Sequence, residues 1–505
     1  MNLTLILFLI FVFSFIYYYF TRTFNYWKDR GIPGPKPIPL FGNVRNGALR
    51  LENHGETIAN IYQQYPNETV AGLFRMTAPT LLIRDLEIIK HIMIKDFEKF
   101  SERGINFSND GLGSNLFHAD TETWRQLRNR MTPLFTSGKL RNIIHLMTER
   151  GDVFIKFIEI ITVNQAEHKI YTLIQRYTMS TIAACAFGID IDDISDNNVM
   201  VKTLFRLDDE IFTRTFAYEL LLMFPNLFKN LNLSVFSKYV TDFFCKLTDS
   251  IINERQGKPT ERRDFMDLIL ELRKQKEILS TTSNDGDKQI NLEISESVIA
   301  SQSFAFFAGG YETSATTVTY MLYLLAKNPH IQEKLLQEID KTLENNNGKL
   351  TYEIISDMTY LRMVFDETLR LFPLVEPLQR SARADYKIPG TDMVIEKNQI
   401  VLITPYGIHH DPKYYPNPEV FDPERFCPKA SAARHPCAYM PFGVGPRNCI
   451  GIRFAKLQSS ICIIKFLSKF RVEPSKNTLT EMKFDPQKAV MSPHGGIFVN
   501  IMKRK

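Results

Sequence analysis

The ten residues 442–451, with the sequence FGVGPRNCIG, constrain the fold of this chain more than any other stretch. They present the thiol of Cys449 on a tight loop just ahead of an apolar, helix-like pattern. The two glycines before the cysteine permit backbone angles and close approaches that a Cβ would forbid, and Gly451 lets the next helix begin close to whatever the sulfur binds. The backbone N–H groups after Cys449 and the cation of Arg447 favour the thiolate. We therefore expect a thiolate presented to a flat metal cofactor; a buried free cysteine in a turn is the alternative.

A helical segment and a later loop carry a second motif. Glu367 and Arg370, in the sequence ETLR, are three residues apart and share one helix face, where a carboxylate and a guanidinium can pair. Arg425, in the sequence PERF, can join them from a loop. Alone, the first pair is a common solvated helix pair. Followed by the cysteine loop, the three residues predict a structural triad that fixes the position of that loop.

The sequence GGYETS at residues 309–314 lies in a long apolar run, at about 294–325, that we expect to form one helix. Two adjacent glycines cost a helix roughly 1 kcal/mol each relative to alanine, so we expect them to make room for a ligand against the backbone. The hydroxyl of Thr313 can bond back to a carbonyl or turn into the cleft, and the carboxylate of Glu312 can pass protons inward. Packing of small residues between helices is the alternative, but it does not explain an acid beside a threonine.

A fourth motif is WRQLR at residues 124–128. The four-residue spacing places Trp124 and Arg128 on one helix face, where both can donate hydrogen bonds to a single acidic group. A half-buried structural tryptophan is the alternative.

Together and in this order, the motifs resemble those of the cytochrome P450 family, and the resemblance covers nearly the whole chain. It implies a mainly α fold with a small β region, the cytochrome P450 fold, and a haem b whose iron takes Cys449 as its axial thiolate. The residues that the resemblance assigns to binding the cofactor, several of them to its propionates, are Trp124, Arg128, Arg380, Phe442, Arg447 and Gly451, with Arg103 as a further candidate.

The resemblance also implies a monooxygenase reaction. Two electrons from NADPH, relayed by NADPH–cytochrome P450 reductase, would drive the insertion of one oxygen atom of O2 into a lipophilic substrate, with cytochrome b5 as a further candidate partner. Glu312 and Thr313 would control oxygen activation. The cysteine loop and the sequence DYKIP at 385–389 are similar to insect microsomal members, which act on plant toxins, insecticides and endogenous lipids.

Three other functions remain as alternatives. The chain could be a haem-binding sensor, or a haem-thiolate isomerase that needs no reductase. A thiol hydrolase using Cys449 has no support beyond scattered histidines such as His409 and His410.

The N-terminus predicts a membrane anchor. The first 21 residues carry no charge and are almost entirely apolar, close to the ~20 residues that cross a bilayer. Arg22, Lys28 and Arg30 follow, so the positive-inside rule keeps the rest of the chain, the catalytic domain, on the cytosolic face of the endoplasmic reticulum membrane. A cleavable signal peptide would require a positive n-region and a small-x-small cleavage site, and both are missing. The expected parts are a transmembrane signal-anchor at 1–21, a proline-rich hinge at 22–43 and one haem-thiolate monooxygenase domain at 44–505.

Composition excludes other classes of protein. The net charge is +5, and no block of Lys and Arg with interleaved aromatics suggests nucleic-acid binding. The six cysteines show no C-x-x-C pair or zinc spacing. With 44% hydrophobic residues and 38 Phe, the chain can form a large core and an apolar pocket.

Between the motifs we expect helices at residues 333–340, 361–371 and 455–470, strands at 80–83, 394–403 and 496–502, and a polar loop at 281–289.

Two surfaces complete the predictions. The substrate pocket is expected to be lined by residues before the glycines and after the ETLR helix: Phe304, Phe307, Ala308, Leu374, Val375 and Glu376. For the two phenylalanines, plain core positions are the alternative. A basic face that would dock an acidic electron donor is formed by Arg125, Arg130, Lys139 and Lys456, with ordinary solvated cations as the alternative.

Overall fold

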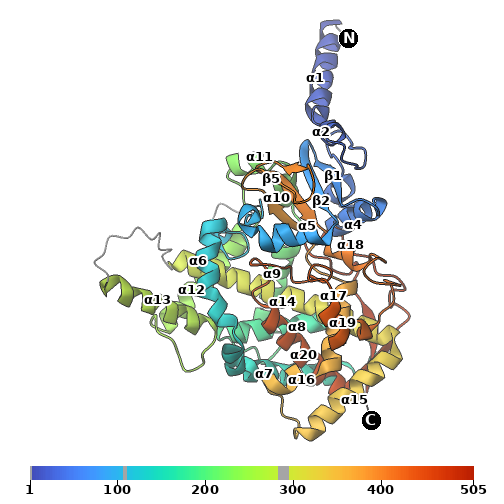
Figure 1. The fold of residues 1–505 in the computed structure, drawn as a ribbon. Coiled ribbons are helices and arrows are strands. Elements are labelled where there is room, and N and C mark those ends of the chain that lie inside the picture. Colours follow the sequence, from blue (N-terminus) through green and yellow to red (C-terminus); the bar gives the residue numbers. More distant parts are fainter. Residues whose placement is uncertain (1–2, 106–110, 283–294, 505) are drawn as a thin grey trace.

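The computed structural model describes residues 3–105, 111–282 and 295–504 (Figure 1). Helix α1, Leu3–Thr21, projects from the body and has no buried residue. Among the described residues it is the one helix long and apolar enough to cross a membrane. The chain then docks on the body at α2, Tyr26–Asp29, where the indole Nε1 of buried Trp27 donates to the carbonyl of Leu73 at 2.8 Å.

A four-stranded sheet lies in the part of the body nearest α1 (Figure 1). Its order is β1-β2-β7-β4, with β2 and β7 parallel and the other pairs antiparallel. A second sheet has the order β3-β9-β8, and β5 pairs with β6. The bounds are β1 Val70–Arg75, β2 Ala78–Ile83, β3 Glu167–Lys169, β4 Leu378–Ser381, β5 Tyr386–Lys387, β6 Val394–Ile395, β7 Ile400–Ile403, β8 Phe470–Pro474 and β9 Phe498–Lys503.

The predicted strand at 80–83 is confirmed as part of β2, and that at 496–502 is confirmed as β9 except that β9 begins two residues later, at Phe498. The predicted strand at 394–403 is wrong in one respect, because it consists of two strands, β6 and β7. The chain turns between them where Asn398 adopts a φ of 67° and the N–H of Gln399 donates to the carbonyl of Glu396. Asparagine tolerates this left-handed conformation better than most residues, so the turn interrupts the ladder there.

Helices make up most of the remaining structure. The α-helices not yet named are α3 Arg45–Ala48, α4 His54–Gln64, α5 Leu86–Lys90, α6 Thr121–Met131, α7 Ser137–Ile161, α8 Ile170–Ile182, α9 Val199–Phe212, α10 Phe216–Met223, α11 Pro225–Asn230, α12 Lys238–Glu254, α13 Phe265–Thr282, α14 Glu296–Lys327, α15 Pro329–Asn345, α16 Tyr352–Asp357, α17 Thr359–Leu371, α18 Pro405–His409, α19 Pro428–Ala433 and α20 Ile452–Lys469. Tighter or wider single turns are η1 His91–Lys95, η2 Phe97–Phe100, η3 Gly111–Ser114, η4 Thr132–Phe135, η5 Ala183–Phe187 and η6 Pro423–Phe426.

Helix α14 runs through the middle of the body (Figure 1). The Ser295 side chain caps its first turn by accepting from the N–H of Val298, and the helix ends at Asn328, before Pro329. The predicted helix at about 294–325 is therefore confirmed, as are those within α15, α17 and α20. Helix α20 begins directly after Gly451, three residues earlier than expected. The predicted polar loop at 281–289 lies outside the described residues except for Thr281 and Thr282, which end α13.

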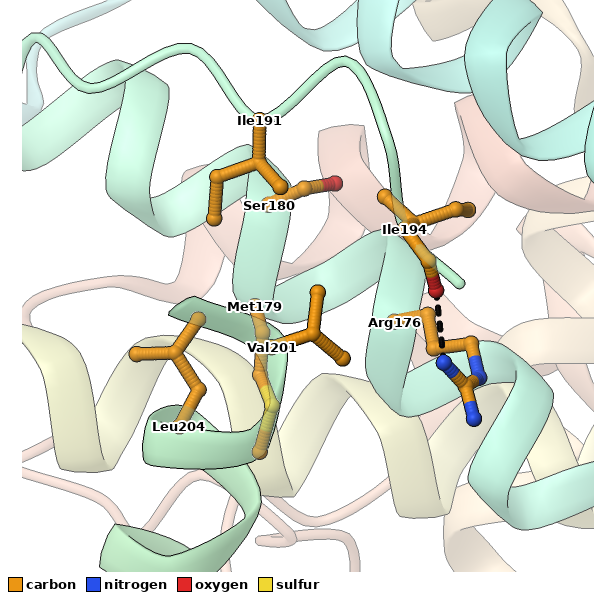
Figure 2. Close-up of a pocket in the computed structure, with 7 residues that line it drawn as sticks. All are labelled: Arg176, Met179, Ser180, Ile191, Ile194, Val201 and Leu204. Carbon is orange, nitrogen blue, oxygen red and sulfur yellow. Dashed lines mark hydrogen bonds between the residues drawn. The ribbon is translucent and has the colours of Figure 1, made fainter. Parts of the chain in front are cut away.

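Two hydrophobic cores hold these elements. The larger surrounds α14 and joins α7, α8, α17 and α20, and the smaller lies between the first sheet, α4 and α5. The larger core contains a small hollow between α8 and α9, lined by Arg176 and the other side chains in Figure 2, with a volume of about 10 Å³. That is room for one water at most. Arg176 closes one side by donating from Nη1 to the carbonyl of Ile194 at 2.6 Å.

Candidate functional site

The cysteine loop is fixed by its backbone. Gly443 and Gly445 have φ values of 68° and 76°, in the left-handed region that favours glycine. A Cβ on Gly445 would lie 1.8 Å from the carbonyl oxygen of Met93 in η1, so this position accepts no side chain without displacement of the loop. The N–H of Cys449 donates to the carbonyl of Phe442 at 2.9 Å, which closes the loop below the sulfur.

Cys449 keeps an accessible surface although protein surrounds it on most sides. Burial raises the pKa of its thiol, while the N–H of Gly451 and then the cations of Arg128 and Arg103 lower it. The guanidinium of Arg447, which the sequence suggested for this role, lies instead over the ring of Trp124 at 4.7 Å and donates to the carbonyl of Ala119 at 2.8 Å.

Three arginines gather beside the cysteine loop without carboxylate partners. Among the described residues, Arg103, Arg380 and Arg447 have no carboxylate within 4 Å, and the Nε of each is buried without a hydrogen-bond partner. Burial and then the charges of the other two lower the pKa of Arg103; burial and then Arg447 lower the pKa of Arg380 to about 9, and burial lowers that of Arg447 to about 10. Clustered buried cations need anions to be stable. The residues therefore fit a group that carries two carboxylates beside a thiolate ligand, as haem b does.

The motif on α6 contributes in two ways. Trp124 is buried, and its ring packs against Phe97 at 5.5 Å. Arg128 donates from Nη1 to the carbonyl of Asn448 at 2.8 Å and from Nη2 to its Oδ1 at 2.7 Å. In this structure Arg128 thus fastens the cysteine loop to α6.

Helix α14 crosses the site with a stripe of small residues. Ala305, Gly309 and Thr313, spaced by four, keep accessible surface on a helix that is otherwise almost wholly buried, and Ala308 is half-buried beside them. A Cβ on Gly309 would meet nothing within 4 Å. The stripe is therefore open, as expected for a surface against which a ligand lies.

The second glycine has a different purpose. A Cβ on Gly310 would lie 2.6 Å from Cδ1 of Ile182 in α8. Gly310 thus serves helix packing, which the sequence left as the alternative for both glycines, and only Gly309 faces open space.

Aromatic contacts connect this helix to the cysteine loop. The ring of Phe306 lies 5.5 Å from that of Phe135, centroid to centroid, and the Phe135 ring lies 4.0 Å from where a Cβ on Gly451 would be. The same Cβ would lie 3.9 Å from the sulfur of Cys449. The stripe and the sulfur thus belong to one region of the molecule.

Thr313 and Glu312 point in different directions. The hydroxyl of Thr313 donates to the carbonyl of Gly309 at 2.8 Å, on the open stripe. The carboxyl of Glu312 is fully buried, accepts from the hydroxyl of Tyr171 in α8, and lies 3.4 Å from the hydroxyl of Ser492. Glu312 is therefore held on the side of α14 that packs against its neighbours.

Burial, and next the charge of Asp208, raise the pKa of Glu312 to about 8. The buried carboxyl therefore keeps its proton at pH 7, where an ordinary glutamate has lost it. Because the folded state then binds a proton that the unfolded state has released, this group makes the fold less stable as pH rises from its usual pKa of 4.5 to about 8.

The residues predicted to line the substrate pocket separate into two groups. Phe304 and Phe307 are 2% and 1% exposed and pack on the rings of Phe236 and Phe244, on the face of α14 away from Gly309. They are core side chains, because aromatic rings from α12 and the segment before it cover that face.

Of the other pocket candidates, Ala308 and Val375 are accessible and Leu374 is buried. Glu376 instead accepts from the N–H of Tyr406 at the start of α18 and is directed toward that helix.

The triad forms as expected. Arg370 donates to Glu367 from Nε at 2.7 Å and from Nη2 at 2.9 Å, both side chains are fully buried, and the Nε of Arg425 lies 3.6 Å from Glu367. Arg370 also donates to the carbonyl of His409 at 2.8 Å.

His409 completes the connection to the cysteine loop, and sequence reasoning missed it. Its Nε2 accepts from the N–H of Met440, just before the loop, and its Nδ1 lies 3.2 Å from the carbonyl of Arg370. With both ring nitrogens engaged, His409 is not available as the base of a thiol hydrolase. His409 forms no sequence motif with Met440 or with Arg370, so residue spacing alone could not have predicted these contacts.

The predicted basic face already contains acids. Arg125 pairs with Glu98 at 2.6 Å, Lys139 with Glu271 at 3.9 Å and Lys456 with Asp366 at 2.9 Å. Arg125 lies on α6 and Lys456 on α20. Arg130, on α6, is a further cation in this region.

Comparison with known proteins agrees with this geometry. The family model described as cytochrome P450 matches residues 32–501. The chain is 55% identical over 486 residues to cytochrome P450 6B2 of Helicoverpa armigera, covering 96% of this chain and 95% of the relative. It is 51% identical to cytochrome P450 6B1 of Papilio polyxenes, with 96% of each chain covered, and 37% identical to cytochrome P450 6a2 of Drosophila melanogaster, with 95% of this chain and 96% of the relative covered.

Proposed function

The chain belongs to the cytochrome P450 family, a family of haem b monooxygenases, and we propose that it oxygenates lipophilic substrates with electrons that NADPH supplies through a flavoprotein reductase. The observation that carries the proposal is one accessible cysteine beside the buried Arg380 and Arg447 and the half-buried Arg103, none of which has a carboxylate partner among the described residues.

The proposed cofactor site follows from these contacts. Cys449 would ligate the iron, and Arg103, Arg380 and Arg447 would bind the propionates. Trp124 and Arg128 would support them, the first by packing under Arg447 and the second by holding Asn448. Phe442 and Gly451 shape the loop on either side of the sulfur. When bound, haem b supplies the iron centre that activates O2, and its thiolate ligand favours O–O cleavage.

Two residues of α14 would manage protons and water on the opposite side. The Thr313 hydroxyl lies on the open stripe, within reach of a ligand there. Glu312 holds a proton in the folded protein. Because its carboxyl contacts Tyr171 and Ser492 on the packed side of α14, that proton would reach the Thr313 side only through a relay of hydrogen-bonded groups. The buried partners of Glu312 keep bulk water away from this step.

Substrate would lie against the open stripe. Ala308, Val375 and Leu374 offer an apolar surface of small and medium side chains. We expect lipophilic substrates such as xenobiotics, plant toxins, insecticides or endogenous lipids, as the resemblance to insect microsomal members implies.

Helix α1 would anchor the protein in the endoplasmic reticulum membrane as a signal-anchor at 1–21, with the hinge at 22–43 and the domain at 44–505 facing the cytosol. An acidic reductase, with cytochrome b5 as a further donor, would dock on the face bearing Arg125, Arg130, Lys139 and Lys456. On docking, carboxylates of the donor would replace the acidic residues of this chain that now pair with these cations.

Reconstitution tests the proposal. The full chain, purified with haem and combined with reductase and NADPH in lipid, should oxidise a panel of lipophilic probes. Failure with every probe despite rapid haem reduction would support a sensor, and turnover without reductase or NADPH would support an isomerase.

Reversing the charge of Arg125 and Lys456 together should slow reduction at low salt and leave substrate-binding spectra intact; an unchanged rate would exclude this docking face.

A further inference from the structure

We propose that a pocket between α16, α17 and α20, on the cysteine-loop side of the molecule and apart from the oxygenation site, binds a small amphipathic carboxylate. Of the residues that line this pocket, the proposed reaction uses only Lys456, which belongs to the proposed docking face. Its walls, charge, size and contact with the cysteine loop each point to such a ligand.

The floor of the pocket is apolar because three helices turn one face toward it. Leu361 and Phe365 are four residues apart on α17, and Met358 lies just before that helix, with Ile355 from α16 and Leu457 from α20 beside them. All five side chains are buried or nearly so. Residues at this spacing share a helix face, so the floor is a continuous apolar surface.

The rim is cationic. Arg362, Arg453 and Lys456 line the pocket, and no acidic residue lines it. Lys456 is neutralised by Asp366 at 2.9 Å. Arg362 and Arg453 are exposed, and within the described residues neither has a carboxylate at ion-pair distance.

The two acids of α16 do not line the pocket. Glu353 is paired with Arg141 of α7, and no ion pair joins Asp357, the last residue of α16, to a described residue of the pocket. Two guanidiniums therefore remain for an external anion. A guanidinium binds a carboxylate in bidentate geometry, as it also binds a phosphate, and the apolar floor favours a carboxylate that carries an alkyl chain.

The size of the pocket limits the apolar part of the ligand. Its volume is about 180 Å³. This is less than the roughly 300–1,000 Å³ of sites for drug-sized molecules. We therefore expect a short-chain acid here, and not the bulky lipophilic compounds expected as substrates.

The floor connects the pocket to the thiolate. The ring of Phe365 stacks on that of Phe442 with centroids 6.4 Å apart and planes 6° apart. The carbonyl of Phe442 accepts the N–H of Cys449 at 2.9 Å. A ligand packed on Phe365 therefore acts, through the stacked rings, on Phe442, whose carbonyl holds the backbone of Cys449. We expect the haem spectrum to change when the ligand binds.

Heptanoate is the probe, and 1-heptanol is its neutral control. The full-length holoprotein is first saturated with an azole that ligates the iron, so that the oxygenation site is occupied. Calorimetry should then show one heptanoate bound per protein, with 1-heptanol at least tenfold weaker. The ferrous carbon monoxide complex, prepared without azole, should shift its Soret band on adding heptanoate, and Phe365→Leu should abolish this shift.

Two variants alter the pocket, and a third, which removes positive charges elsewhere on the protein, controls for the change in net charge. Arg362→Gln with Arg453→Gln should weaken heptanoate at least tenfold. Ser460→Phe, which fills the pocket from its half-buried wall and keeps every charge, should abolish binding. Lys229→Gln with Lys238→Gln removes two charges from α11 and α12 and should change nothing. Each variant must show the normal carbon monoxide spectrum.

Several results would overturn the proposal. Displacement of heptanoate by the azole would place it in the oxygenation site. Equal binding of heptanol, or equal loss in the Lys229 and Lys238 variant, would remove the role of the guanidiniums. Capture of an acidic peptide with an aromatic anchor, without heptanoate binding, would assign the pocket to a protein partner instead. Because none of these measurements uses turnover, their outcome is independent of whether the reductase-driven reaction is confirmed.

Discussion

The two surfaces that meet at Cys449 and Gly309 are built on different principles. The cysteine-loop side is held by backbone geometry and buried charge: two glycines at positive φ, a carbonyl that excludes a side chain at Gly445, and the Glu367–Arg370 pair. The α14 side is one helix that presents small residues around Gly309. The first surface accepts almost no change, and the second changes shape with each side chain. Such a molecule can keep one chemistry while its substrates vary.

The largest effect should come from breaking the triad. Arg370→Ala leaves the carboxylate of Glu367 buried with only the longer contact to Arg425, a loss of roughly 3–5 kcal/mol. We expect little folded haem protein. Lys387→Ala removes a cation from the pair with Asp392, whose side chains are 62% and 103% exposed, and should have no measurable effect. Haem content and thermal unfolding measure both; equal behaviour of the two variants would show that the triad does not fix the loop.

Phe307→Ala tests the other surface. Because Phe307 is core, the variant should lose roughly 3–5 kcal/mol of stability with its substrate preference unchanged. Val375→Ala, at a side chain that is 36% exposed, should change the preference and leave the unfolding temperature nearly constant. The measurement is the ratio of turnover rates across several substrates. Altered ratios in a stable Phe307→Ala protein would show that Phe307 lines the substrate pocket.

Gly445→Ala tests whether the close approach of the cysteine loop to η1 is needed for haem binding. Both Gly445 and Gly390 have φ near 76°, so alanine costs about 1–2 kcal/mol at either site. Only at Gly445 would the new Cβ meet a carbonyl, that of Met93; at Gly390 it meets nothing within 4 Å. We expect haem affinity to fall in Gly445→Ala and to persist in Gly390→Ala. Equal affinity in the two proteins would mean that the loop can move away from η1 without cost.

Thr313→Ala should have the smallest effect on the fold. The variant should keep its haem but divert NADPH electrons to hydrogen peroxide, since the hydroxyl on the open stripe is gone. Thr319→Ala, which removes the same kind of bond to the carbonyl of Ala315 inside the core, is the matched control and should stay coupled. Product formed per NADPH is the measurement, and full coupling in Thr313→Ala would exclude this role.

Much of the site could be predicted from the sequence because its motifs are local. The glycine loop, the Glu367–Arg370 spacing and the Thr313 segment each place side chains within a few residues of one another, where helix and turn geometry decides the outcome. The small sheets are less local: β2 and β7 are parallel and separated by more than 300 residues, and the turn at Asn398 was missed.

The sequence could not predict which neighbouring elements several side chains contact in the folded protein. Spacing could not say that Gly310 meets Ile182, that Phe304 and Phe307 face other rings, or that Arg128 reaches Asn448. These contacts depend on which helices cross, and helix crossing is set by the whole core rather than by a segment. The same reason hid His409, whose partners lie 31 and 39 residues away.

The central claim is that Cys449 presents a thiolate to the haem iron. The carbon monoxide difference spectrum of the reduced protein tests it most directly, with Cys462→Ala, at a fully buried cysteine of α20, as the control. The account predicts the red-shifted Soret band of a thiolate complex in the wild type and in Cys462→Ala, and its loss in Cys449→Ala. A Cys449→Ala protein that retains that band would contradict the assignment and, with it, the function proposed for the chain.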